Sequence, residues 1–139
     1  MGYTNYYHAK NRKKINDSDF KNFMSDTYKA VEILMQKGFK FADDKTDEIY
    51  KDIDDFKAKN QKEIWLNGVG DDSHETFLID FKGSWAFCKT ARKPYDLAVK
   101  AILILAEKHG ILKEPFDFDG DRTDIEFTDA EAFIKEHYE

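Results

Sequence analysis

The most suggestive stretch of this sequence is a cluster of positive charge directly before a segment with helical spacing. Lys89, Arg92 and Lys93 stand just ahead of Pro94, and an apolar run follows. The N-terminus of a helix has unpaired N–H groups and a partial positive charge, which together favour an anion. The same dipole disfavours cations there, so these side chains need a negative partner. That partner is either a bound phosphate or an internal carboxylate, such as one from the acidic segment 114–139.

A second polar cluster lies in a loop with two glycines, at residues 67–77. Glycine lets the backbone turn sharply, and the amide and carboxylates beside it could read the polar edges of a ligand, through Asn67, Asp71 and Asp72. The loop could instead hold Mg²⁺ or Mn²⁺, because oxygen ligands with one imidazole suit these ions. The ligands would then be Asp71, Asp72, His74 and Glu75. Strand alternation sends His74 and Glu75 to opposite faces, and a hairpin loop with solvated acids is the simpler interpretation.

Aromatic side chains near the N-terminus add surface on which a flat ring could stack. Tyr6 and Tyr7 lie close to a basic segment at 10–14, a combination that can stack bases and follow a phosphate backbone. The formal net charge of the chain is −6, however, which argues against general coating of nucleic acid. The lysines are therefore expected to keep a strand edge soluble, and nucleic acid is not an expected partner.

The acidic segment that begins at Asp117 invites comparison with a calcium-binding EF-hand loop, which it does not fit. Such a loop needs glycine at its sixth position and a bidentate acid at its twelfth. Counted from Asp117, glycine falls fourth and Thr128 twelfth. We expect a turn that presents its acids to solvent, or to Lys89 and Arg92.

Length and composition favour one folded domain. The chain has 139 residues, 41% of them hydrophobic and 15% aromatic, enough to bury a core within a single domain over residues 1–139. The single cysteine, Cys88, excludes an intrachain disulfide and fits a buried thiol in a reducing compartment. The longest apolar run, 101–106, is too short to cross a bilayer, so we expect a cytoplasmic protein without a membrane partner.

The first half of the chain is predicted to form a strand, a long helix and a charged excursion. The strand spans 3–15, and the helix follows a cap at Asp17 or Ser18 and ends before Gly38. The highly charged segment 42–62 is expected to be a loop with one short helix.

The second half mixes strands and helices without βαβ regularity, which predicts an α+β fold. The expected elements are three strands that form an antiparallel meander, a helix, a further strand and a helix capped by Thr128, at 63–68, 76–81, 85–90, 94–109, 111–118 and 129–138. The whole pattern predicts a small antiparallel sheet of three to five strands packed against two to four helices.

Three motifs occur in the order N-terminus, hairpin loop, strand-to-helix junction. They are Gly2-Tyr3-Thr4-x-Tyr6, Asn67-Gly68-Val69-Gly70-Asp71-Asp72 with Glu75-Thr76-Phe77, and Phe87-Cys88-Lys89-Thr90-Ala91-Arg92-Lys93-Pro94-Tyr95-Asp96. In this set and order the chain resembles a family of small proteins of unknown function encoded by bacteriophages, prophages, some bacteria and large DNA viruses. Members often have Trp where this chain has Tyr7, and Ser-Asp-Gly in place of residues 118–120. The resemblance implies a phage accessory protein and carries no particular activity.

We therefore expect a binding protein rather than an enzyme, and no catalytic residue or cofactor is assigned. The preferred hypothesis is a binder of a small anionic, nucleotide-like ligand, which could disarm nucleotide-signalled immunity in a bacterial host. Phosphate would be held by Lys89, Arg92 and Lys93. Stacking and polar contacts would come from Tyr6, Tyr7 or Tyr95 and from Asn67, Asp71 and Asp72.

Two alternatives stay open. The first is a phosphoesterase that uses Mg²⁺ or Mn²⁺ in the loop 67–77, with Lys89 and Arg92 stabilising charge in the transition state. The second is a protein-docking inhibitor of a host defence protein, whose acidic C-terminal helix imitates the charge of nucleic acid. All three hypotheses use the same charged residues, and a homo-oligomer is compatible with each.

Overall fold

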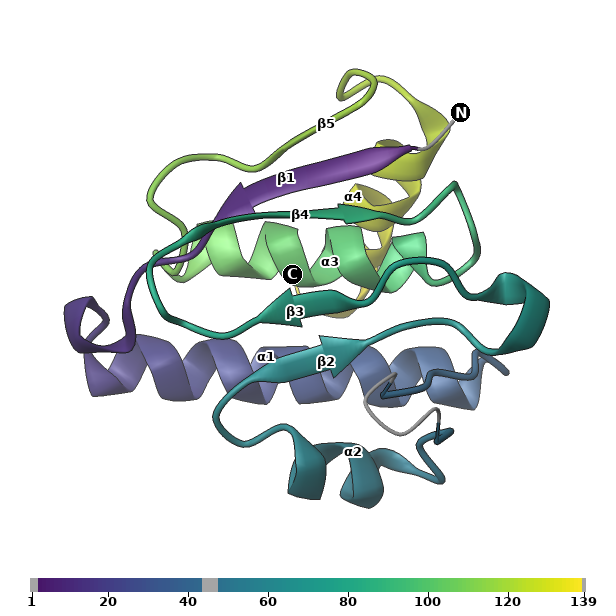
Figure 1. The fold of residues 1–139 in the computed structure, drawn as a ribbon, viewed down its shortest axis with the longest axis horizontal. Helices are drawn as coiled ribbons and strands as arrows, with labels where there is room; N and C mark the ends of the chain where they lie inside the picture. The colour runs from purple at the N-terminus through teal and green to yellow at the C-terminus, as the bar shows by residue number, and fades with distance from the viewer. Residues whose placement is uncertain (1–2, 44–47, 139) are drawn as a thin grey trace.

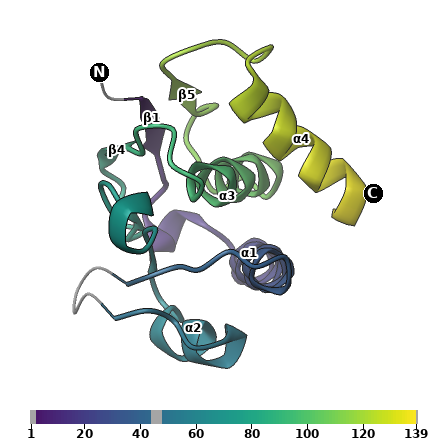
Figure 2. The same ribbon diagram turned by 90° about the vertical axis from the view of Figure 1, so that its right-hand side faces the viewer.

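Strands form one layer of the molecule, and the helices α1 and α3 cover one side of it (Figure 1 and Figure 2). The computed structural model describes residues 3–43 and 48–138. Within them, a three-stranded antiparallel sheet has the order β4-β1-β5, and β2 pairs antiparallel with β3. The strands are β1 at Thr4–His8, β2 at Ile64–Leu66, β3 at Phe77–Ile79, β4 at Trp85–Lys89 and β5 at Asp117–Phe118. The predicted α+β class with a small antiparallel sheet is confirmed.

The helices pack against one another in the order α2-α1-α3-α4. α1 contacts both α2 and α3, and α4 lies against α3 on the side away from the strands (Figure 2). The bounds are α1 at Asp17–Gln36, α2 at Ile53–Lys59, α3 at Asp96–Lys108 and α4 at Ile125–Tyr138, with 3-10 turns η1 at Arg12–Lys14 and η2 at Gly70–Asp72. Gly2 of the first motif and residues 44–47 of the charged segment lie outside the described residues.

The predicted long helices are present, but two of the predicted caps are wrong. The side-chain oxygen of Asn16, not of Asp17 or Ser18, accepts a hydrogen bond from the Asp19 N–H (2.7 Å) at the start of α1. The last helix begins at residue 125 instead of 129, so Thr128 lies inside its first turn and its hydroxyl donates to the Ile125 carbonyl (3.3 Å).

The predicted meander is wrong in one pairing, because the ladder partner of β4 is β1 and not β3. The register sets Tyr6 opposite Phe87 and His8 opposite Trp85. The link between β3 and β4 is not a tight hairpin, because Phe81 adopts a left-handed conformation (φ 55°) and its carbonyl accepts from the Arg12 N–H (2.8 Å). This hydrogen bond holds the link between β3 and β4 against the segment that follows β1, and β4 then pairs with β1.

Two predicted strands are shorter than expected, each for a local reason. The first strand ends at His8, and the Asn11 side chain then accepts from the Lys13 N–H (3.0 Å), which favours the turn η1 over continued strand. The segment 111–118 is reduced to two residues of β5 and one bridge, and its Pro115 has no N–H to offer a ladder.

The core fills the space between the strands and α1 with α3. Phe23, Leu34, Phe77 and Ile102 are fully buried there. Side chains alternate across a strand, so inward residues of β1 and β4 leave their neighbours pointing away from the helices. Within residues 3–43 and 48–138, no helix packs over this outward face of the sheet (Figure 1).

Candidate functional site

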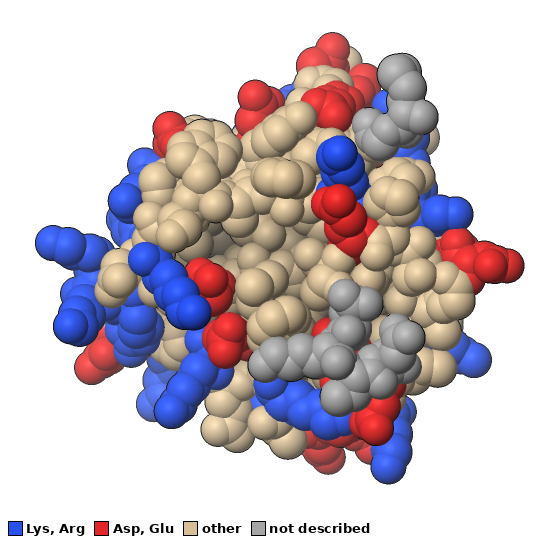
Figure 3. All heavy atoms as spheres, viewed as in Figure 1, with Lys and Arg blue, Asp and Glu red and all other residues tan. Residues whose placement is uncertain are grey.

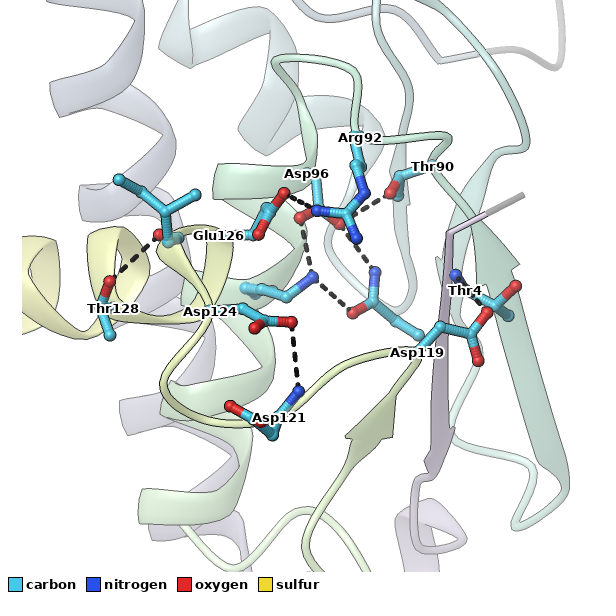
Figure 4. A network of polar contacts seen from close by, with 12 residues as sticks. Thr4, Thr90, Arg92, Asp96, Asp119, Asp121, Asp124, Glu126 and Thr128 are labelled. Carbon is cyan, nitrogen blue, oxygen red and sulfur yellow. Dashed lines mark hydrogen bonds and ion pairs between the residues drawn. The ribbon is translucent and has the colours of Figure 1, made fainter. Parts of the chain in front are cut away.

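A buried polar network joins β1 to the first turn of α3 (Figure 4). The Lys100 ammonium donates to Asp96 Oδ2 (2.7 Å) and to Asn5 Oδ1 (2.9 Å). Asp96 Oδ1 also accepts from the Asn5 amide (2.8 Å) and from the Thr90 hydroxyl (2.7 Å). Burial lowers the pKa of Lys100, and the adjacent Asp96 carboxylate opposes that shift. Because the bonds are complementary and the side chains are buried, the network holds the junction together and presents no charge to a ligand.

Arg92 lies above this network and has an internal partner. Its guanidinium forms an ion pair with Glu126 at the start of α4 (Figure 4). It also lies 4.5 Å from the centre of the Tyr3 ring. Of the two partners expected for this cation, the structure therefore supplies a carboxylate of the acidic C-terminal segment. The preceding Ala91 and Arg92 itself both adopt left-handed backbone conformations (φ 51° and 56°), which direct the junction towards α4.

The loop 67–76 is organised by a buried asparagine. Asn67 Oδ1 accepts from the N–H groups of Gly68 (2.7 Å) and His74 (3.0 Å), and its amide donates to the His74 carbonyl (2.9 Å). A Cβ at Gly68 would lie 2.1 Å from the Asp72 carbonyl oxygen, so only glycine fits this close approach. Asn67 therefore shapes the loop, whereas Asp71 and Asp72 are exposed in η2.

Glu75 fastens this loop to the strand-to-helix junction. Its carbonyl accepts from the Tyr95 hydroxyl (2.5 Å) and the Cys88 thiol (3.3 Å), and its carboxylate accepts from the Lys89 N–H (2.8 Å). Burial raises the pKa of the Cys88 thiol to about 12, which leaves it protonated and unreactive at neutral pH, as the sequence predicts for a buried thiol. Residues from the second and third motifs thus meet here, chiefly to build the fold.

The alternative metal site in this loop receives no support from the geometry. Across residues 3–43 and 48–138, no group of three or more His, Cys, Asp or Glu side chains is placed to share an ion. His74 is exposed, and the Glu75 carboxylate is engaged by backbone.

The outward face of the sheet carries exposed aromatic side chains. Trp85 and Phe87 of β4 are 62% and 59% exposed, and they alternate with the buried Cys88. Opposite them on β1 stand His8 and Tyr6, and the His8 and Trp85 ring centroids are 5.7 Å apart. We call these four residues, Tyr6, His8, Trp85 and Phe87, the aromatic face.

Lys89 extends the aromatic face along β4. It is exposed and follows Phe87 by two residues, so its side chain leaves the same side of the strand. Sequence reasoning selected Tyr6 and Lys89 but missed Trp85 and Phe87. The signal that could have identified them is the alternation Trp85-x-Phe87-x-Lys89, which sends these side chains to one side of a strand while Cys88 points to the other.

Charged side chains surround the aromatic face, with Glu114 beside His8 and the Glu75 carboxylate at the backbone of Lys89. Beyond its His8 and Trp85 end, the chain segments after β1 and before β4 are bridged at Asn11 and Lys82, which brings together the partly exposed Lys10 and the exposed Lys13, Lys14 and Lys82. In Figure 3 the middle of the viewed side is largely uncharged, and Lys and Arg gather at the edge where η1 lies. On the opposite flank, Asp117 pairs with Tyr6, and Asp119 accepts from the Tyr6 hydroxyl (3.1 Å).

The remaining predicted ligand residues are divided between other places. Tyr7 is buried, and its hydroxyl donates to the Leu78 carbonyl (2.8 Å). Asp72 and Tyr95 line a cavity of about 400 Å³ with Lys37 and Lys40, and Arg92 and Lys93 line a smaller one of about 130 Å³. The structure therefore brings Tyr6 and Lys89 onto one surface and keeps the other residues apart from it.

No helix in the described ranges combines the length and apolar composition that a bilayer crossing requires. Comparison of the chain with protein families, with curated proteins and with solved structures finds no match.

Proposed function

We propose that this protein binds an anionic ligand with a flat ring, such as a nucleotide, on the aromatic face. The observation that carries the proposal is the exposure of Trp85 and Phe87, both about three-fifths accessible although they belong to a strand of the sheet. Exposing such large apolar rings side by side is unfavourable in a protein without a partner for that surface. Stacking of a base on an aromatic side chain contributes about 1–3 kcal/mol, so two rings offer substantial affinity.

The anionic part of the ligand would contact Lys89. This side chain is exposed beside Phe87, and in the described part of the chain it has no carboxylate within ion-pair distance. Arg92, in contrast, is already paired with Glu126. The proposal therefore keeps the predicted ligand class and assigns the phosphate contact to Lys89.

Binding to a sheet face also agrees with a role that needs no catalysis. A phage-encoded binder of this kind would act by sequestering a nucleotide signal of its host. A protein-docking inhibitor would use the same exposed aromatic residues, but it would not depend on a nucleotide.

Trp85 provides a direct test. The fluorescence of the protein should be quenched by a nucleotide that stacks on this ring, and titration with a panel of mononucleotides and cyclic dinucleotides would give the affinity. We expect Phe87→Ala and Lys89→Ala each to weaken binding about tenfold. Lys135→Ala removes an exposed lysine of α4 and serves as the matched control, with unchanged affinity. Absence of binding to every nucleotide in the panel would reject the proposal.

A further inference from the structure

We infer that the ligand of the aromatic face is a single-stranded nucleic acid, more than one nucleotide long. This inference rests on the proposed function and narrows it to a polymer. It is carried by three features of the surface: two consecutive stacking positions, lysines at both ends, and acids along one flank.

The stacking positions come in two pairs along the strands. His8 with Trp85 forms one register pair, and Tyr6 with Phe87 forms the other. Residues two apart on an antiparallel strand are separated by about 7 Å, roughly twice the ~3.4 Å rise between bases in one strand of a duplex. The surface therefore suits neighbouring bases that are splayed apart, as they are in an extended single strand, and a paired duplex cannot offer its base faces in this way.

Positive charge stands at both ends of these two positions. Lys89 follows Phe87 at one end, and Lys10, Lys13, Lys14 and Lys82 gather beyond His8 and Trp85 at the other. A mononucleotide has its phosphate on one side of its base and can use only one of these ends. A chain of nucleotides has phosphates before and after each base, so it can occupy both.

The acidic flank fixes where the phosphates run. Asp117 stands opposite Tyr6 on β5, and Asp119 is hydrogen-bonded to the Tyr6 hydroxyl. These carboxylates repel phosphate, so the backbone would follow β4 while the bases lie across β1. A carboxylate near the base edges can accept hydrogen bonds from exocyclic amino groups. The formal net charge of −6 does not oppose this arrangement, because four lysines gather locally beyond His8 and Trp85.

The test compares thymidine monophosphate, a thymidine dinucleotide and a thymidine octanucleotide by quenching of tryptophan fluorescence. We expect the octanucleotide to bind at least a hundredfold more tightly than the monophosphate. Its logarithmic affinity should fall with the logarithm of salt concentration, with a slope of about −0.7 for each phosphate contacted. A duplex of the same length should bind at least tenfold more weakly than the single strand.

A pair of double variants assigns the basic end. Lys13→Ala/Lys14→Ala should lower the affinity for the octanucleotide about tenfold and leave the monophosphate unaffected. The matched control, Lys57→Ala/Lys135→Ala, makes the same change in net charge on α2 and α4 and should alter neither affinity. Thermal unfolding of each variant checks that the fold is retained.

Each outcome separates the inference from the proposed function. Equal affinity for the monophosphate and the octanucleotide would overturn the inference and leave a mononucleotide binder. Failure of these ligands and of the wider nucleotide panel to bind would reject both, and would favour a protein partner for the aromatic face. Equal loss of octanucleotide binding in both double variants would show that net charge, not the basic end, governs the affinity, which contradicts the inference.

Discussion

Arg92 and Glu126 form an ion pair that joins the strand-to-helix junction to the first turn of α4. The pair lies beside Asp96 (Figure 4), whose carboxylate accepts from the buried Lys100 ammonium. Arg92 therefore stabilises the fold through an internal partner, and its removal should affect stability more than ligand binding.

Replacement of Arg92 tests this assignment. Arg92→Ala should lower the free energy of unfolding by about 1 kcal/mol, because it removes a partly exposed ion pair and a cation–π contact with Tyr3. Urea denaturation measures the change, and Glu126→Gln should give a similar loss with a less than additive double variant. If Arg92→Ala instead lowered nucleotide affinity strongly and left stability unchanged, Arg92 would be a phosphate-binding residue.

Two tyrosines that are neighbours in the sequence should have opposite roles. Tyr7→Phe removes the hydrogen bond from the buried hydroxyl to the Leu78 carbonyl and should cost about 1 kcal/mol of stability, with nucleotide binding unchanged. Tyr6→Ala removes a ring from the aromatic face and should weaken binding several-fold. Denaturant midpoints and fluorescence titrations of both variants would show whether the inward side of β1 serves stability and the outward side serves binding.

The two loop glycines provide a matched pair. Gly68→Ala should destabilise the protein by roughly 3 kcal/mol, since its Cβ would meet the Asp72 carbonyl oxygen at 2.1 Å. At Gly70 a Cβ meets nothing within 4 Å, and only its left-handed backbone (φ 57°) opposes a side chain. Gly70→Ala should therefore cost about 1 kcal/mol. Equal effects on the melting temperature would contradict the close approach at Gly68.

Alkaline pH should destabilise the protein through Cys88. Burial raises the pKa of this thiol from 9.0 to about 12, so above pH 9 the unfolded chain loses a proton that the folded chain keeps. The stabilising contribution is complete below pH 9 and is lost as pH rises towards 12, with an upper limit of about 4 kcal/mol.

The thiol's share can be isolated by mutation. Cys88→Ala should reduce the slope of unfolding free energy against pH between 9 and 12, measured by denaturant titration. Some slope should persist, because burial also raises the pKa of Tyr50 to about 12. An identical slope in the variant and the parent protein would show that the thiol is not responsible.

The sequence by itself determined the elements whose signal is local. The apolar spacing from Phe20 to Leu34 gave α1, the run after Pro94 gave α3, and the mixture of elements gave the α+β class, all of which the structure confirms. A helix is readable because its hydrogen bonds and its buried stripe lie within a few residues of one another. The buried state of Cys88 followed from its apolar neighbours in the same way.

Only the tertiary structure decided which strands pair and which charges are free. The partner of β4 depends on the distant N-terminal strand, and the partner of Arg92 on a carboxylate 34 residues away. Neither follows from local spacing, because strand pairing and ion pairing depend on which distant segments the core brings together. The exposure of Trp85 and Phe87, on which the proposed function rests, could not be predicted for the same reason. It depends on the position of β4 in a sheet whose outward face, in the described residues, carries no helix.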